Sequence, residues 1–171
     1  MVEENDAPWL DADQKREWRS LVALVMTLPP ALDAQLKRDS GLNMFEYSVL
    51  AALSESPEQR LPMSELARLA RGSRSRLSHA VSRLEAAGWV TRGSCTESGL
   101  RTAAVLTAEG RRKVEATAPG HVAEARRLVV DALTPEQLRA LGEAARAIVD
   151  RSAPDLADVF AEQDAAAEQS R

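Results

Sequence analysis

Apolar residues between positions 63 and 107 follow helical spacing twice and then form two short strand-like runs. Residues 63–70 carry a first stripe of leucine and alanine. Residues 73–85 carry a longer stripe, in which Leu77, Val81 and Leu84 recur three and four positions apart. This spacing places each set on one face of an α-helix. The pattern therefore predicts two successive helices joined by a short turn, which is a helix-turn-helix.

Residues that begin and end helices agree with this assignment. Ser64 is the expected cap of the first helix and Ser73 that of the second, while Gly88 follows the end of the second. Two β-prone or apolar runs come next, at 89–92 and 102–107, and the stretch between them is rich in turn residues. A hairpin after a helix-turn-helix predicts a winged helix, whose second helix enters the major groove of DNA.

The remaining chain carries further helix-start signals. Asp11, Asn43 and Thr134 each stand three residues before a glutamine or glutamate, which is the pattern of a capping box, and Thr107 is a further expected cap. Leu61-Pro62 is the expected edge strand of the wing, since proline is tolerated at sheet edges. The fold class predicted is mainly α with a small β-hairpin wing.

Two proline sites fall inside helical stripes. Pro29-Pro30 interrupts the first helix, but the apolar stripe resumes after it, so we expect a kink there and not an end. Pro119-Gly120 falls in the middle of a later stripe, and we expect that helix to be bent or broken.

Charge is distributed unevenly along the chain. The 171 residues carry a net charge of −4, but residues 71–112 contain eight arginines and three glutamates, a net +5. The rest of the chain therefore carries −9. A basic block that coincides with a helix-turn-helix and wing indicates a phosphate-binding surface.

Four motifs carry a family resemblance: Met-Ser-Glu-Leu-Ala at 63–67, Ser-Arg-Leu-Ser-His-Ala-Val-Ser-Arg-Leu-Glu at 75–85, Gly-Trp-Val at 88–90 and Leu-Thr-Ala-Glu-Gly at 106–110. Together they resemble the MarR family of transcription regulators, over roughly residues 10 to 150. The resemblance implies a winged helix-turn-helix with an added helical dimerisation region. It also implies a small, often aromatic or phenolic, effector bound between the dimer helices and the winged helix.

The outer face of helix 73–85 is the predicted DNA-reading surface, because its side chains are basic or hydroxylated. Arg76 has the reach and the bidentate geometry to contact guanine. Arg83 lies further along, where it is expected to contact phosphate or to pair with a carboxylate.

The wing departs from its apparent family. That family commonly carries Asp-x-Arg shortly before the Leu-Thr pair, and here the two places hold Ser98 and Leu100. Arginine follows one residue later, so the resemblance implies Arg101 as the minor-groove arginine and Arg92 as a backbone contact. The predicted DNA-binding residues are Ser73, Arg74, Ser75, Arg76, Ser78, His79, Ser82, Arg83, Arg92 and Arg101.

The organisation predicted is an N-terminal dimerisation helix (10–40), a winged helix-turn-helix (43–107), C-terminal dimerisation helices (108–151) and an acidic, flexible tail (152–171). The outer helices would bury little alone. Packed on a second copy, they make a homodimer that binds a palindromic operator as a regulator, expected to be a repressor. The alternative is a monomer whose outer helices fold onto its own winged helix.

Other functional classes receive little support. Gly72 to Arg76 approaches a nucleophile elbow, but arginine replaces the final glycine, and no Walker loop, HExxH or dinucleotide fingerprint occurs. We therefore predict no enzymatic activity, no catalytic residue, no cofactor and no metal ligand. Cys95 is the only cysteine, so a redox-responsive regulator is one alternative. A metal-responsive regulator and a winged helix used only for protein docking are the others.

The effector contacts are less defined. Trp18 could line an effector pocket, although an aromatic on an apolar helical stripe is more often core. His121 is either a ligand or metal contact, or a capping or surface group. No apolar run approaches the roughly 18 residues of a membrane span, and no secretion signal opens the chain, so a cytoplasmic protein is expected.

Overall fold

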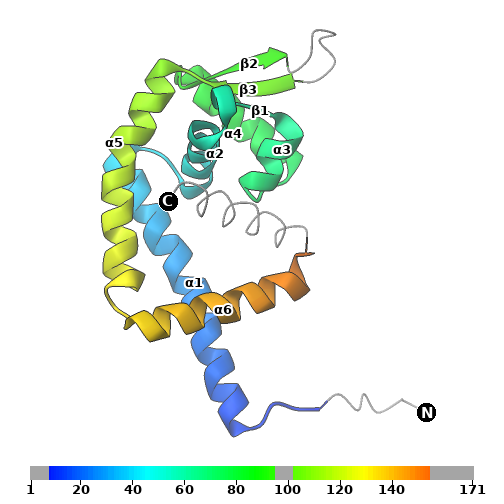
Figure 1. Cartoon of the computed structure of the whole chain (residues 1–171), viewed down its shortest axis with the longest axis vertical. Coiled ribbons are helices and arrows are strands. Elements are labelled where there is room, and N and C mark those ends of the chain that lie inside the picture. Colours follow the sequence, from blue (N-terminus) through cyan, green and yellow to red (C-terminus); the bar gives the residue numbers. More distant parts are fainter. Residues whose placement is uncertain (1–7, 95–101, 155–171) are drawn as a thin grey trace, which may run out of the picture.

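The computed structural model describes residues 8–94 and 102–154. They form a mainly helical chain with a small antiparallel sheet, which confirms the predicted fold class (Figure 1). The elements are α1 (Ala12–Ser40), α2 (Met44–Glu55), a 3₁₀ turn η1 (Pro57–Gln59), β1 (Arg60–Pro62), α3 (Met63–Leu69), α4 (Arg74–Ala86), β2 (Val90–Ser94), β3 (Thr102–Leu106), α5 (Ala108–Ala125), a π-helical turn η2 (Arg126–Val130) and α6 (Pro135–Ser152).

The winged helix consists of α2, α3, α4 and the three strands. The strand order is β1-β3-β2, with Arg60 opposite Val105 and Val90 opposite Leu106. The edge strand predicted at Leu61-Pro62 is therefore confirmed. One apolar core joins these elements, and its fully buried members include Leu42, Val49, Leu50, Leu53, Leu66, Leu77, Ala80, Val81, Leu84, Val90 and Ala104.

Most of the predicted helix starts are confirmed. Asp11, Asn43 and Thr134 each form the reciprocal hydrogen bonds of a capping box. The Ser73 side chain accepts from the Arg76 backbone N–H, and Thr107 accepts from the N–H of the third helical residue. These caps satisfy backbone N–H groups that lack a partner within the helix.

Two local predictions are wrong. Ser64 is not a cap, because α3 begins at Met63 and Pro62 occupies the cap position without a side-chain hydrogen bond. Of the bend or break expected at Pro119, the break does not occur, since α5 runs through this residue to Ala125 and a π-helical turn follows. Packing of α5 along α1 supports the continuous helix. α1 also continues through Pro29 and Pro30, and it does not end there, as expected.

The helices outside the winged helix leave much of their apolar surface uncovered. α1 and α5 pack along one another and lead away from the winged helix towards α6 (Figure 1). α6 has no buried residue. The Trp18 side chain, expected to be core, is 56% exposed in the single chain. The other exposed large apolar residues on these helices are Leu24, Val25, Met26, Val122 and Ile148.

No helix among the described residues has both the length and the apolar character that crossing a bilayer requires.

Candidate nucleic-acid interface

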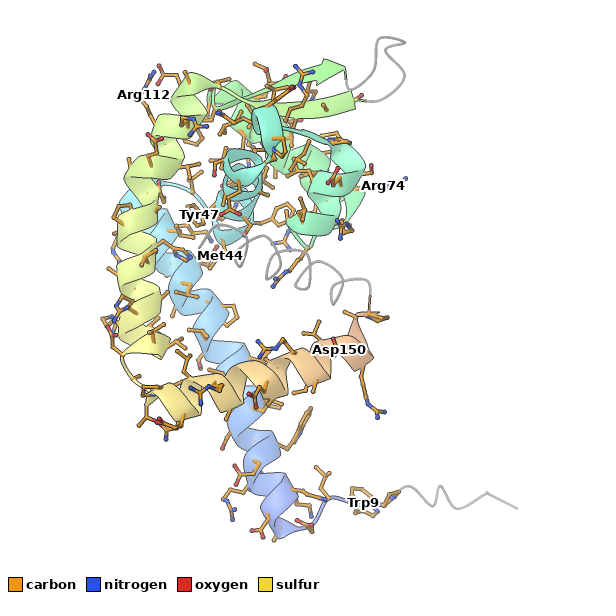
Figure 2. All side chains as sticks on the ribbon, in the orientation of Figure 1. Trp9, Met44, Tyr47, Arg74, Arg112 and Asp150 are labelled. Atoms are coloured by element: carbon orange, nitrogen blue, oxygen red, sulfur yellow. The ribbon has the colours of Figure 1, made fainter. Side chains whose placement is uncertain are left out.

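The outer face of α4 is exposed along its whole length, as the three- and four-residue spacing of the apolar positions predicts. Leu77, Ala80, Val81 and Leu84 are buried. The predicted DNA contacts of this segment are all exposed: Ser73, Arg74, Ser75, Arg76, Ser78, His79, Ser82 and Arg83. Arg74 projects from the edge of the winged helix (Figure 2). The structure thus brings eight of the ten predicted residues onto one surface.

One flank of this face contacts α2. The Arg83 Nε donates to Oε1 of Glu46 at 2.6 Å, across 37 residues of sequence. Glu46 is only 7% exposed, and its other oxygen, Oε2, accepts from the backbone N–H of Asn43 at 3.0 Å. The expectation that Arg83 pairs with a carboxylate is confirmed. The bond uses Nε and the Arg83 side chain is 58% exposed, and its expected contact with phosphate stays a prediction.

Arg76 lies on the same flank and contacts an aromatic ring. Its guanidinium carbon is 4.2 Å from the centroid of Phe45, within the range of a cation–π interaction. In the sequence, Glu46 is recognisable only as the glutamate of the capping box that begins at Asn43, and Phe45 is an apolar residue beside it. Their contacts with α4 had no local signal, because the partners are distant in the chain.

The other flank of α4 contacts the wing. The Arg92 side chain, from β2, donates to Glu85 Oε2 at 3.2 Å and to Ser82 Oγ at 2.9 Å. It also approaches the backbone oxygen of Ser78 at 3.5 Å. Arg92 therefore fixes the wing to the exposed side of α4, and its proposed contact with the DNA backbone remains a prediction.

Asp33 connects α1 to the winged helix. Its carboxylate accepts from the Met44 backbone N–H at 2.8 Å and pairs with Lys37 at 2.7 Å. These hydrogen bonds, that of Lys37 first and that of Met44 second, hold the pKa of Asp33 below its usual value. A groove of about 690 Å³ lies beside this carboxylate, and its lining includes Pro29, Pro30, Phe45, Arg76, His79 and Arg83.

A polar cluster joins α5 to α1 and α2. The Nδ1 atom of His121 lies 3.3 Å from Oε1 of Gln35, and its ring meets the Tyr47 ring edge-on with centroids 4.8 Å apart. Gln35 is buried and donates to Asp39 Oδ2 at 3.0 Å. Burial lowers the pKa of His121, which favours the neutral form of the ring. The residue is half-buried, neither a cap nor a surface group as expected.

His121 and Tyr47 also line a second groove, of about 750 Å³, on the face of the winged helix where Met44 and Tyr47 lie (Figure 2). Its other lining residues come from α2, α3 and the loop between them, among them Ala51, Ala52, Leu61 and Leu69. Within the described part of the chain, no group of three or more His, Cys, Asp or Glu side chains is placed to hold a metal ion.

The tip of the wing lies outside the described residues. This applies to Arg101, the predicted minor-groove arginine, to Ser98 and Leu100, and to Cys95.

Comparison with known proteins gives a consistent result. A model of the MarR family matches residues 40–99. Sco3205, a MarR family transcriptional regulator from Streptomyces coelicolor whose crystal structure is a complex with DNA, is 46% identical, with a TM-score of 0.80 over 84% of this chain and 91% of that chain.

Two further regulators from Streptomyces coelicolor are similar. AbsC, a MarR family transcriptional regulator, is 36% identical, with a TM-score of 0.80 over 85% of this chain and 97% of that chain. Sco5413, of the same family, is 25% identical, with a TM-score of 0.67 over 81% of this chain and 94% of that chain. Comparison with curated proteins found no match.

The exposed basic face of α4 and the wing fixed beside it are the features that such a regulator uses to contact DNA. Similarity to Sco3205 and AbsC extends over more than four-fifths of the chain, so it includes the outer helices as well as the winged helix. The chain belongs to the MarR family of transcriptional regulators, which are DNA-binding proteins and not enzymes.

Proposed function

We propose that this regulator is a repressor that binds a palindromic operator as a homodimer, with α4 of each subunit in the major groove. The observation that carries the proposal is the outer face of α4, where arginine, serine and histidine side chains are exposed on a winged helix. The similar protein Sco3205 forms a complex with DNA. A two-fold dimer would present two such helices about one DNA turn apart.

The uncovered apolar surface of the outer helices supports the dimer. Trp18, Val25 and Met26 of α1 are more than half exposed, and Ile148 of α6 is nearly so. Several large apolar side chains exposed on the outer helices are typical of an interface with another protein. A second copy is its occupant in this proposal, because a palindromic operator requires two subunits related by a two-fold axis.

Release by a small molecule is the second part of the proposal. The groove of about 750 Å³ has the size of a small-molecule site, and it combines alanine and leucine with the polar groups of Tyr47 and His121. A phenolic or aromatic effector would pack on the alanines and meet a neutral imidazole. Binding there would act between α5 and the winged helix, because His121 belongs to α5 and Tyr47 to α2.

Selection of bound fragments from the source genome tests the operator directly. We expect enriched fragments to share an inverted repeat with half-sites about 10 base pairs apart, centre to centre. Enrichment of sequences without a two-fold repeat would contradict binding as a symmetric dimer. The same experiment would supply the duplexes for the measurements below.

Arg76→Ala is expected to weaken binding to the selected operator by about 1–3 kcal/mol and binding to random DNA much less. The reason is that a bidentate arginine–guanine pair carries sequence information, whereas phosphate contacts do not. Titration of both duplexes at one salt concentration measures the difference. Arg139→Ala, at an exposed position of α6, is the control and should change neither affinity. Equal losses on both duplexes would remove Arg76 from base readout.

A further inference from the structure

Arg76 and Phe45 form a contact whose geometry is set by the turn of the helix-turn-helix. Phe45 is the second residue of α2 and is 6% exposed, so its ring belongs to the core. One face of the ring carries the Arg76 guanidinium, with the 4.2 Å separation given above. A core aromatic is thus in direct contact with the side chain assigned to guanine.

Gly72, in the turn before α4, fixes where the ring lies. A Cβ atom at this position would come within 2.4 Å of both Cε2 and Cζ of Phe45. No real side chain tolerates that distance, so the ring edge occupies the space that any other residue would need at position 72. Turn backbone and ring are therefore fitted to each other, and the ring cannot approach the turn more closely.

The Phe45 ring is the direct contact of Arg76, and the Asp33 carboxylate adds only a weaker charge attraction. Asp33 is the nearby carboxylate, but its oxygens already serve Lys37 and the Met44 backbone N–H. Glu46 is likewise engaged by Arg83. A guanidinium on an aromatic face keeps its in-plane N–H groups available for hydrogen bonds.

We propose that Phe45 is a specificity-determining positioning residue, which restricts the Arg76 side chain before DNA arrives and leaves its N–H groups free for guanine. The inference rests on the proposed function, namely base readout by Arg76. A long arginine side chain loses rotamer freedom when it is ordered on DNA, and a contact made beforehand reduces that loss. Phe45 would then raise the preference for operator over random DNA without contacting either duplex.

The test is a double-mutant cycle that uses the full-length protein. Operator and scrambled duplexes of equal length are titrated with the unmodified chain, Phe45→Leu, Arg76→Ala and the double variant. We expect Phe45→Leu to lower the ratio of operator to scrambled affinity by about three- to tenfold, in line with the strength of cation–π contacts. In the Arg76→Ala background the same substitution should leave that ratio unchanged.

Two further variants separate positioning from general stability. Leu53→Val, in the same helix and core, should lower the unfolding temperature without changing the affinity ratio. Gly72→Ala keeps the phenyl ring but displaces it, so it should lower the ratio in the unmodified chain and not in the Arg76→Ala background. This variant also provides the test if Phe45→Leu does not fold.

Each contrary outcome has a distinct meaning. If Phe45→Leu or Gly72→Ala lowers the ratio equally with and without Arg76, or leaves it unchanged in the unmodified chain, the positioning role is overturned while base readout stands. If Arg76→Ala itself leaves the ratio unchanged, base readout by Arg76 fails, and the positioning role of Phe45 is overturned with it.

Discussion

Ile148→Asp is expected to convert the proposed dimer into monomers and to lower operator affinity by roughly 10²- to 10⁴-fold, the advantage gained by linking two half-site contacts. Ile148 is 49% exposed on the apolar stripe of α6, and α6 contributes no buried residue to its own chain. A carboxylate at this position would have to be desolvated without a partner when two subunits associate. Affinity for random DNA should fall far less, since each winged helix keeps its phosphate contacts.

Ala147→Asp is the matched control, because it introduces the same charge at an exposed position of the same helix, about 100° around the axis from Ile148 and outside the apolar stripe. Light scattering after size-exclusion chromatography measures the mass of each variant, and thermal unfolding of the monomer reports on the winged-helix core. Truncation before Thr134 should also give monomers and lose high-affinity binding. A dimeric, operator-competent Ile148→Asp protein together with a dimeric truncated chain would exclude α6 as the interface.

Helix boundaries were predictable from the sequence where their cause is local. The capping boxes at Asp11, Asn43 and Thr134 involve partners three residues apart, so the residue types alone indicate the hydrogen bonds. The stripe of Leu77, Val81 and Leu84 is local in the same sense, since 3.6-residue periodicity determines which face is buried. The exposed DNA-reading face then follows as the complement of that stripe.

Contacts between distant segments were not predictable in this way. Nothing near Arg83 in the sequence indicates that Glu46 is its partner, and nothing near Arg92 indicates a contact with Ser82. Pro119 illustrates the opposite error: its local preference predicted a bend or a break, but packing of α5 on α1 supports an unbroken helix. Tertiary packing outweighs one missing backbone hydrogen bond when a helix is held along its length.

The start of α5 shows how a local motif and a distant contact combine. In Leu-Thr-Ala-Glu-Gly, the Thr107 hydroxyl donates to the Gly88 backbone oxygen at 2.7 Å and accepts from the Gly110 N–H at 3.0 Å. The Thr107 N–H donates to the Trp89 oxygen at 3.1 Å. A Cβ at position 110 would lie 2.1 Å from that same oxygen. Glycine is therefore required where α5 crosses the chain between α4 and the wing.

Gly110→Ala is consequently expected to lower the free energy of unfolding by about 2–4 kcal/mol, through overpacking against backbone and loss of the Thr107–Trp89 hydrogen bond. Thermal or urea unfolding at one fixed protein concentration measures the change, because dimerisation makes the midpoint depend on concentration. Operator affinity should fall as well, since the displaced junction joins the wing to the helix that leads to the proposed dimer interface.

Gly120→Ala, in the same helix, should change the free energy of unfolding in the opposite direction. Its Cβ would meet only the Gln35 side-chain nitrogen, at 3.6 Å, which is an ordinary contact distance. Alanine there should raise the free energy of unfolding by about 0.5–1 kcal/mol, because it restricts the unfolded chain and favours the helix. If both substitutions changed stability in the same direction and by similar amounts, close approach to Trp89 would not be the reason for glycine at position 110.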